Sequence, residues 1–253
     1  MIHTLKTIGL LPYRAVWFPD VADVAEVRAL QVPVTVIRQG SEAFMEAFGP
    51  DTIRHRRFCT AMVDLTVDPD VLHANLNRTR RNRLRKAANH SFEYRFGSPE
   101  NHTEACQLID GFNRQMFGHP VSAANWRLTA QTGWVAQVTL NGQVMAAISV
   151  ITDGRARVRV LYGATAQRTN DPVLGRLISD LNSILVWTDL LRCQELGFQK
   201  YDLGGLFDDP AHPSSGVDEF KMSFGAQKVY EYHALSSSWW ATRQAMRILV
   251  RTF

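Results

Sequence analysis

Alternating apolar and polar positions predict short strands through much of the chain. The strands are expected at residues 32–38, 61–65, 92–96, 134–140, 144–151, 155–162, 200–203 and 228–235. Asn141-Gly142 lies between two of these runs, and Asn-Gly is a strong signal for a two-residue hairpin turn. Residues 144–151 are apolar almost throughout, which is typical of a strand buried on both faces.

The strand at residues 155–162 has a different pattern, because arginines alternate with apolar residues. We expect its apolar positions to face the core and its basic positions to face water. The basic positions are Arg155, Arg157 and Arg159.

Apolar residues spaced three and four apart predict helices between these strands. Asp68-Pro69 suits a helix start, since aspartate caps free N–H groups and proline fits the first turn. From there a broken apolar stripe runs to Ala88. Further helices are expected at residues 42–48, 105–116 and 171–196, and a short turn or helix is expected at 220–224. The helix at 105–116 is expected to bury Ala105, Leu108, Ile109, Phe112 and Met116 on one face.

The order of these elements predicts an α/β (α+β) fold with a mixed sheet flanked by helices. A helix precedes a three-stranded meander, and a long helix, a strand and a closing strand follow. We expect a partial N-terminal subdomain at residues 1–59, a main domain at 60–235 and a C-terminal amphipathic helix at 236–253. That last helix carries tryptophans and arginines, a pattern that suits docking on the domain or peripheral contact with an anionic membrane.

The composition is that of a globular protein, with 45% apolar and 21% charged residues. No apolar run reaches the length of about 18 residues that a transmembrane helix needs, and the N-terminus does not resemble a signal peptide. Three widely separated cysteines favour a reducing compartment over a disulfide framework, so we expect a cytoplasmic protein. No Cys/His spacing predicts a metal site. A net charge of +4 permits an anionic partner. The oligomeric state stays open.

Six cations occur within nine consecutive residues, and no acidic residue lies among them. They are Arg78, Arg80, Arg81, Arg83, Arg85 and Lys86. On a helix, cations at this density point in most directions. One interpretation is contact with phosphates, including those of RNA. The other is a solvated helix whose arginines pair with acidic loops.

Several motifs in a fixed order resemble the GNAT-type fold in its FemAB-like branch. They are the basic segment 76–87, residues 182–187 in the long helix, Tyr201-Asp-Leu-Gly-Gly205 and Gly216-Val-Asp-Glu-Phe-Lys-Met-Ser-Phe-Gly225. The resemblance implies acyl transfer to an amine of a small metabolite or a sugar or peptide precursor. In the FemAB branch the donor is an aminoacyl-tRNA, and related GNAT proteins use acyl-CoA. FemAB enzymes have two GNAT-like domains, and this chain has room for one and a partial N-terminal half.

The same resemblance implies a set of site residues. Phe220 and Lys221 are expected to line the acceptor channel, where a fixed cation steadies the oxyanion that forms when an ester carbonyl is attacked. Substrate contacts are expected at Asp202, Gly204, Gly205, Tyr162 and Asn182. The glycines end a strand, and ligands favour the C-terminal ends of strands in open α/β sheets. The alternative for Asp202 and the glycines is a tight turn.

Residues 167–176 bear on the choice of donor, because they lack the glycine pattern of acetyl-CoA enzymes. A pyrophosphate needs close backbone approach and free N–H groups at a helix N-terminus. Asp171 and Pro172 place a negative charge and a missing donor there instead. Aminoacyl-tRNA is therefore the expected donor, with no bound cofactor. Acyl-CoA is the alternative, and a non-catalytic protein that binds RNA or an anionic surface is a third reading. Cys193 follows an apolar helical pattern and is expected to be a buried thiol.

Overall fold

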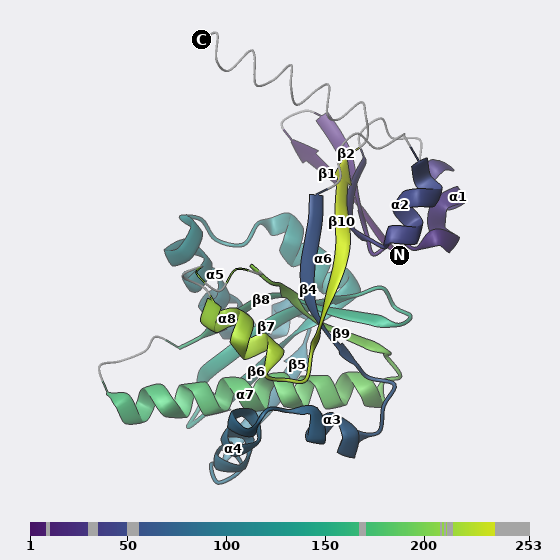
Figure 1. The fold of residues 1–253 in the computed structure, drawn as a ribbon. Coiled ribbons are helices and arrows are strands. Elements are labelled where there is room, and N and C mark those ends of the chain that lie inside the picture. The colour runs from purple at the N-terminus through teal and green to yellow at the C-terminus, as the bar shows by residue number, and fades with distance from the viewer. Residues whose placement is uncertain are drawn as a thin grey trace. The chain divides into compact units, whose positions relative to one another are not determined.

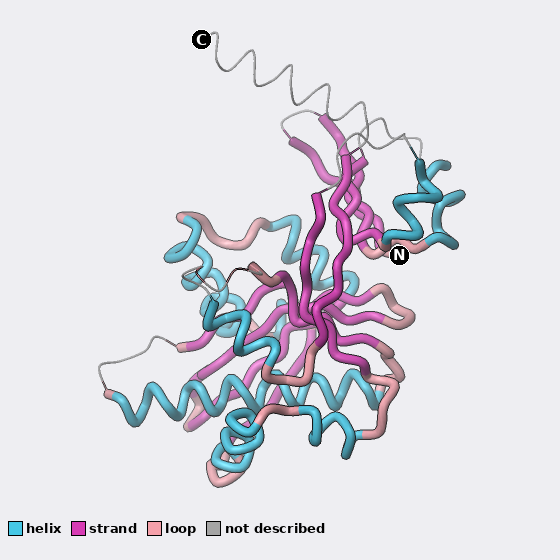
Figure 2. Tube along the Cα trace, in the orientation of Figure 1, coloured by secondary structure: helices cyan, strands magenta, loops and turns pink. Residues whose placement is uncertain are grey.

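The computed structural model describes residues 1–8, 11–29, 35–49, 56–166, 171–207, 209, 211 and 215–235 (Figures 1 and 2). The chain divides into two compact units, which we describe separately. The terminal unit comprises Met1–Thr60 and Val229–Phe253, and the central unit comprises Ala61–Lys228.

The terminal unit contains a small mixed sheet with the strand order β1-β2-β3-β10. These strands are β1 (Ile2–Ile8), β2 (Leu11–Trp17), β3 (Thr35–Gly40) and β10 (Gln227–Leu235, in the terminal unit from Val229). The strands β2 and β3 run parallel, and the other neighbouring pairs are antiparallel. The helical segments are η1 (Val21–Asp23), α1 (Val24–Ala29) and α2 (Glu42–Phe48). Phe44 and Ile37 lie at the centre of its core.

The central unit carries the strand order β4-β9-β8-β7-β6-β5. These strands are β4 (Arg56–Asp64, in the central unit from Ala61), β5 (Phe92–Gly97), β6 (Gly133–Leu140), β7 (Gln143–Thr152), β8 (Arg157–Thr165) and β9 (Lys200–Gly205). The strands β6, β7 and β8 form the expected antiparallel meander, and β9 runs parallel to β8. The predicted mixed, mostly antiparallel sheet is confirmed.

Alternate residues of the meander face two separate clusters of apolar side chains. Ala136 and Ile148 pack toward α7 (Pro172–Glu195), whereas Val135 and Ala147 pack toward α5 (Thr103–Phe117). Because successive side chains of a strand point to opposite faces, these two helices cover opposite faces of the sheet. The remaining elements are α3 (Pro69–Asn75), α4 (Arg78–Ala87), η3 (Pro99–Asn101), α6 (Ala123–Thr132) and α8 (Ser215–Met222). The helix α4 packs against α7 (Figure 1).

The single helix expected from Pro69 onward is wrong, because the structure has two helices there. Leu76 is extended, and the side chain of Asn77 accepts a hydrogen bond from the N–H of Arg80 at the start of α4. An asparagine at this position caps a new helix. The basic run therefore forms a separate helix with its own orientation.

The helix α5 also departs from the expected apolar face. Ala105 and Ile109 are buried as expected, but Phe112 is 42% exposed and Met116 is 55% exposed. The apolar stripe is longer than the part of the sheet that the helix covers. Sequence periodicity reveals which residues share a face, and the neighbouring elements decide how much of that face is covered.

Several expectations fall outside the described residues. They concern the C-terminal helix at 236–253, residues 167–170 of the segment before α7 and part of the loop at 208–214. Among the helices that the structure describes, none combines the length and the apolar character needed to cross a membrane.

Candidate functional site

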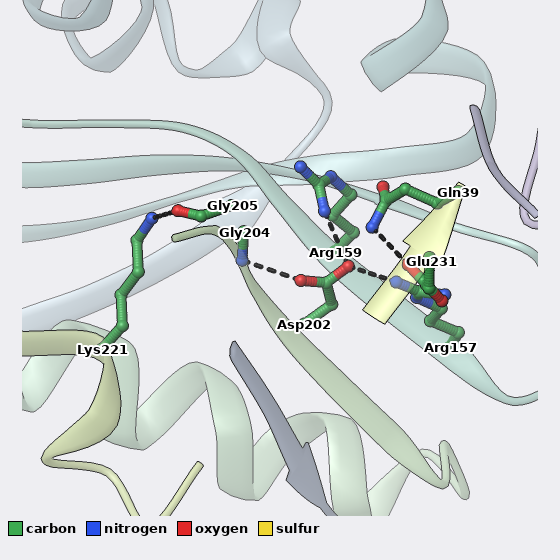
Figure 3. Close-up of polar contacts among 8 residues, drawn as sticks. All are labelled: Gln39, Arg157, Arg159, Asp202, Gly204, Gly205, Lys221 and Glu231. Atoms are coloured by element: carbon green, nitrogen blue, oxygen red, sulfur yellow. Dashed lines mark hydrogen bonds and ion pairs between the residues drawn. The ribbon is translucent and has the colours of Figure 1, made fainter. Parts of the chain in front are cut away.

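Lys221 lies in the last turn of α8, and its ammonium group donates a hydrogen bond to the carbonyl oxygen of Gly205 (Figure 3). The side chain is half-buried and points at the end of β9. Burial lowers the pKa of Lys221, and the nearby Arg159 guanidinium lowers it further, while Asp218 and Asp202 oppose the shift. The structure therefore holds a cation at the strand end that the sequence singled out.

Gly204 is shaped by the same close packing. Its φ angle is +92°, and a Cβ added there would lie 3.3 Å from the carbonyl oxygen of Val160 and 3.7 Å from Nζ of Lys221. A residue with a side chain would be strained in this conformation and would crowd the lysine. Glycine at this strand end therefore lets the ammonium group approach the backbone.

Asp202 binds two arginines of the neighbouring strand. It is fully buried and accepts hydrogen bonds from Arg157 and from Arg159 at 2.7 Å, and from the N–H of Gly204 at 2.8 Å (Figure 3). A carboxylate with these donors has little capacity left for a substrate or for accepting a proton. Direct substrate contact by Asp202 stays a prediction that this geometry does not favour. Its visible role is to hold β8 and β9 together.

The wet, basic face expected for the 155–162 strand is wrong for Arg157 and Arg159, whereas Arg155 is exposed as expected. Arg157 is 7% exposed, and the side chain of Arg159 is almost as buried. Their pairing with Asp202 makes this burial tolerable, because an unpaired charge would be strongly disfavoured in the core. Sequence reasoning missed both arginines as members of the site. The sequence feature that could have revealed them is that one strand carries two arginines and the next apolar strand carries an aspartate that can pair with both.

Lys221, Arg157 and Arg159 contribute three cations to the surroundings of Gly204, together with the carboxylates of Asp202 and Asp218. A fixed cation in a partly buried position can stabilise a developing negative charge.

Phe220 stacks with Arg80 of α4, and its expected place along an acceptor channel stays a prediction. The guanidinium carbon of Arg80 lies 4.3 Å from the centre of the Phe220 ring and 4.5 Å from that of Phe224. Arg80 also donates hydrogen bonds to the hydroxyls of Ser223, at 2.9 Å, and Ser183. Phe220 therefore anchors the helix that carries Lys221.

Arg80 is only 4% exposed, so it differs from the surface cation that the basic run suggested. Burial lowers its pKa to about 10, and the neighbouring Arg83 adds to the shift. A phosphate on the surface cannot reach a guanidinium enclosed by two rings and two hydroxyls. We correct the expectation for this residue: Arg80 links α4 to α7 and α8.

The other cations of α4 have varied surroundings. Arg81 donates to the carbonyl oxygens of Ala74 and Leu76 at the end of α3, and Arg83 pairs with Asp180 of α7 at 2.9 Å. The side chains of Arg78, Arg85 and Lys86 are exposed. A phosphate-binding role for these residues stays a prediction.

Tyr162 and Asn182 are not brought to Lys221 by any contact that the described residues show. The hydroxyl of Tyr162 accepts a hydrogen bond from Asn125 of α6 at 2.6 Å, on the face covered by α5. Asn182 is half-buried on α7. Their substrate roles remain predictions.

Cys193 is fully buried, and burial raises the pKa of its thiol, with Asp189 adding to the shift. This agrees with the expected structural thiol, since a nucleophile needs the thiolate. Within the described residues, histidine, cysteine and acidic side chains form no group that could hold a metal ion.

Comparisons with known proteins identify the fold. No protein-family model and no curated protein sequence matches the chain. The C-terminal domain of a protein described as a lysylphosphatidylglycerol synthetase from Agrobacterium fabrum aligns with a TM-score of 0.60 and 16% identity, over 98% of this chain and 84% of that one. FemX aligns with a TM-score of 0.60 and 11% identity, over 91% and 82%.

L-PGS from Bacillus licheniformis has the same architecture, with a TM-score of 0.54 and 12% identity over 91% of this chain and 79% of that one. At these identities the likeness establishes the fold alone. The chain therefore shares the fold of FemX and of these synthetase domains, and the FemAB-like fold predicted from the sequence motifs is confirmed.

Proposed function

We propose that the protein is an acyltransferase that joins an aminoacyl group to an amine, with an aminoacyl-tRNA as the donor. The observation that carries the proposal is the position of Lys221, whose ammonium group is held against Gly204 and Gly205 at the end of β9. Support comes from the fold shared with FemX and with proteins named for lysylphosphatidylglycerol synthesis.

The proposed reaction needs no covalent enzyme intermediate. The acceptor amine attacks the ester carbonyl of the donor, a C–N bond forms, and negative charge develops on the carbonyl oxygen. Collapse of this intermediate breaks the C–O bond, and the proton that the amine loses ends on the departing hydroxyl. Lys221 acts by stabilising the oxyanion, and the site accelerates the reaction further by holding both reactants in place.

The test is donor consumption by the purified protein, followed by mass spectrometry against a panel of amine acceptors. We expect transfer from charged tRNA, and we expect Lys221→Ala to lower kcat by about a hundredfold, as loss of one oxyanion donor does in other enzymes. Thermal unfolding of this variant should change little. The matched control is Lys200→Ala, which removes an exposed lysine at the opposite end of β9. Wild-type turnover in Lys221→Ala would remove this residue from the mechanism.

A second candidate is an acyl-CoA-dependent N-acyltransferase, and one observation favours it. Among the described residues, β8 pairs with β9 only from Arg157 to Arg159, although β8 continues to Thr165. Backbone groups along this edge could hydrogen-bond the amides of an extended acyl-CoA arm. Direct titration separates the two donors: micromolar binding of CoA with acyl-CoA consumption supports this candidate, and consumption of charged tRNA supports the first.

If neither donor is consumed, the result favours a third function, in which the protein binds RNA or an anionic surface without catalysis. The exposed cations of α4 are the observation that favours it. RNA binding that weakens steeply with salt, together with no transfer of any acyl group, is its expected signature.

A further inference from the structure

A groove between α4 and α7 in the central unit has a volume of about 650 Å³. Small-molecule sites occupy about 300–1,000 Å³, so the groove is large enough for one. Its walls are formed by Thr79, Asn82, Arg83, Lys86, Asn89 and His90 and by Val173, Arg176, Leu177 and Asp180. Val173, Arg176, Leu177 and Asp180 lie on one face of α7, and Thr79, Asn82, Arg83 and Lys86 lie on one face of α4. Asn89 and His90 extend the second wall just beyond the end of α4.

The charges of the groove are unbalanced. Asp180 is the acidic residue of the lining, and its carboxylate already pairs with Arg83 at 2.9 Å. In the part of the chain that the structure describes, neither Lys86 nor Arg176 has an ion-pair partner, and both are exposed. Two uncompensated cations on facing helices favour an anion that carries two charges, such as a phosphate monoester.

The remaining lining residues further limit which class of ligand fits the groove. Asn82, Asn89 and Thr79 can donate and accept hydrogen bonds, as a sugar requires. Val173 and Leu177 supply an apolar wall, and Val173 is 64% exposed. Inorganic phosphate alone would leave this wall uncovered, whereas a nucleoside would cover it.

We propose that this groove binds a nucleoside monophosphate group, with its phosphate between Lys86 and Arg176 and its sugar or base against Val173 and Leu177. Such a group can come from a free nucleotide or from the end of an RNA chain. The walls contain no residue of the Lys221 cluster, so the inference stands whether or not the protein transfers an acyl group.

The groove does not depend on free N–H groups at the start of α7. The side chain of Asp171 accepts a hydrogen bond from the N–H of Val173 at 2.8 Å, so that donor is already engaged. The ligand is therefore held by side chains from two helices, and single substitutions can test it without disturbing the backbone.

The experiment is isothermal titration of the full chain with adenosine 5′-monophosphate, adenosine, inorganic phosphate and a short single-stranded RNA that ends in adenosine. We expect the monophosphate to bind more tightly than adenosine and phosphate. Lys86→Gln and Arg176→Gln should each weaken its binding by about tenfold, the effect of losing one charge-assisted hydrogen bond. Arg127→Gln, which removes an exposed arginine of α6 outside the groove, should leave binding unchanged.

Each outcome of this titration is decisive. Tighter binding of the RNA than of the monophosphate identifies an RNA end as the source of the group, and equal or weaker binding identifies a free nucleotide. The proposal is overturned if adenosine or inorganic phosphate binds as tightly as the monophosphate. It is also overturned if no saturable binding occurs, or if Arg127→Gln reduces affinity as much as the groove variants do.

Discussion

The surroundings of Lys221 disfavour the charged form of its side chain. Burial and the Arg159 guanidinium lower its pKa, so the folded protein releases this proton more readily than an unfolded chain would. At a pH below the pKa that Lys221 has in the folded protein, its charged ammonium group lowers the free energy of unfolding. As the pH rises through that pKa, the group loses its proton and the free energy of unfolding increases. A residue that opposes stability in this way is a good candidate for function.

The lowered pKa of Lys221 predicts an alkaline limit on transfer. If the ammonium form stabilises the oxyanion, kcat should fall as pH rises through the pKa of Lys221, which lies below the ordinary lysine value of 10.5. Arginine keeps its charge to much higher pH, so Lys221→Arg should move the alkaline limb upward. The measurement is the pH profile of the initial transfer rate, corrected for spontaneous hydrolysis of the donor.

A matched variant separates this effect from general alkaline damage. Lys200→Arg replaces an exposed lysine at the other end of the same strand, and its profile should match that of the wild type. An alkaline limb that stays in place in Lys221→Arg would mean that another group titrates.

At the scale of elements, α4 has two distinct faces. Arg80, Leu84 and Ala87 are buried and face α7 and α8, while Arg83 and Lys86 line the groove. Arg80 stacks on Phe220, the residue before Lys221. The helix that lines the groove is therefore also in contact with the helix that carries the candidate catalytic lysine.

This contact predicts different outcomes for two substitutions of Arg80. Arg80→Met keeps most of the volume, and Ser183 and Ser223 still donate to the carbonyl oxygens of Ser179 and Phe220, so we expect a loss of less than about 1.5 kcal/mol in the free energy of unfolding. Arg80→Ala leaves a cavity and should cost about 2–5 kcal/mol. Urea denaturation measures both values.

The same pair of variants tests the link to Lys221. We expect Arg80→Met to lower kcat for transfer while KM for the donor is unchanged, because Phe220 of α8 and Phe224 just beyond it lose the guanidinium that lies against their rings. If Arg80→Met and Arg80→Ala lower the free energy of unfolding equally, the charge of Arg80, and not its volume, stabilises the fold.

At the scale of the whole molecule, the net charge of +4 is modest, and the exposed cations of α4 concentrate positive charge on one helix. If these cations contact RNA phosphates, affinity must fall with salt, because binding releases counterions. Arg78→Gln combined with Arg85→Gln should make the slope of log K against log salt shallower by about 1.4, or about 0.7 for each cation removed.

Fluorescence anisotropy of a labelled single-stranded RNA measures this slope. The control is Arg114→Gln with Arg127→Gln, which removes the same charge from exposed positions on α5 and α6. An equal change of slope in both double variants would assign RNA binding to the overall charge and not to α4.

Local patterns predicted most elements of the central unit. Asn141 and Gly142 have φ angles of 51° and 78° and form the expected hairpin turn, and Pro172 opens the long helix after its Asp171 cap. In the terminal unit, β1, β2 and α1 were not predicted, and α6 of the central unit was also missed. Their apolar patterns are weak over short lengths, and pairing with distant strands compensates for weak local preference.

The sequence by itself determined the hairpin turn at Asn141-Gly142, the starts of α3 and α7 and the FemAB-like order of elements, because each of the first two depends on residues within a few positions of one another. Only the tertiary structure decided which arginines are buried. Arg80 donates a hydrogen bond to Ser183, which lies 103 positions away in the sequence, and Arg157 pairs with Asp202, which lies 45 positions away. The groove between α4 and α7 was decided in the same way, because a helix face becomes a binding wall only when folding places a second face opposite to it.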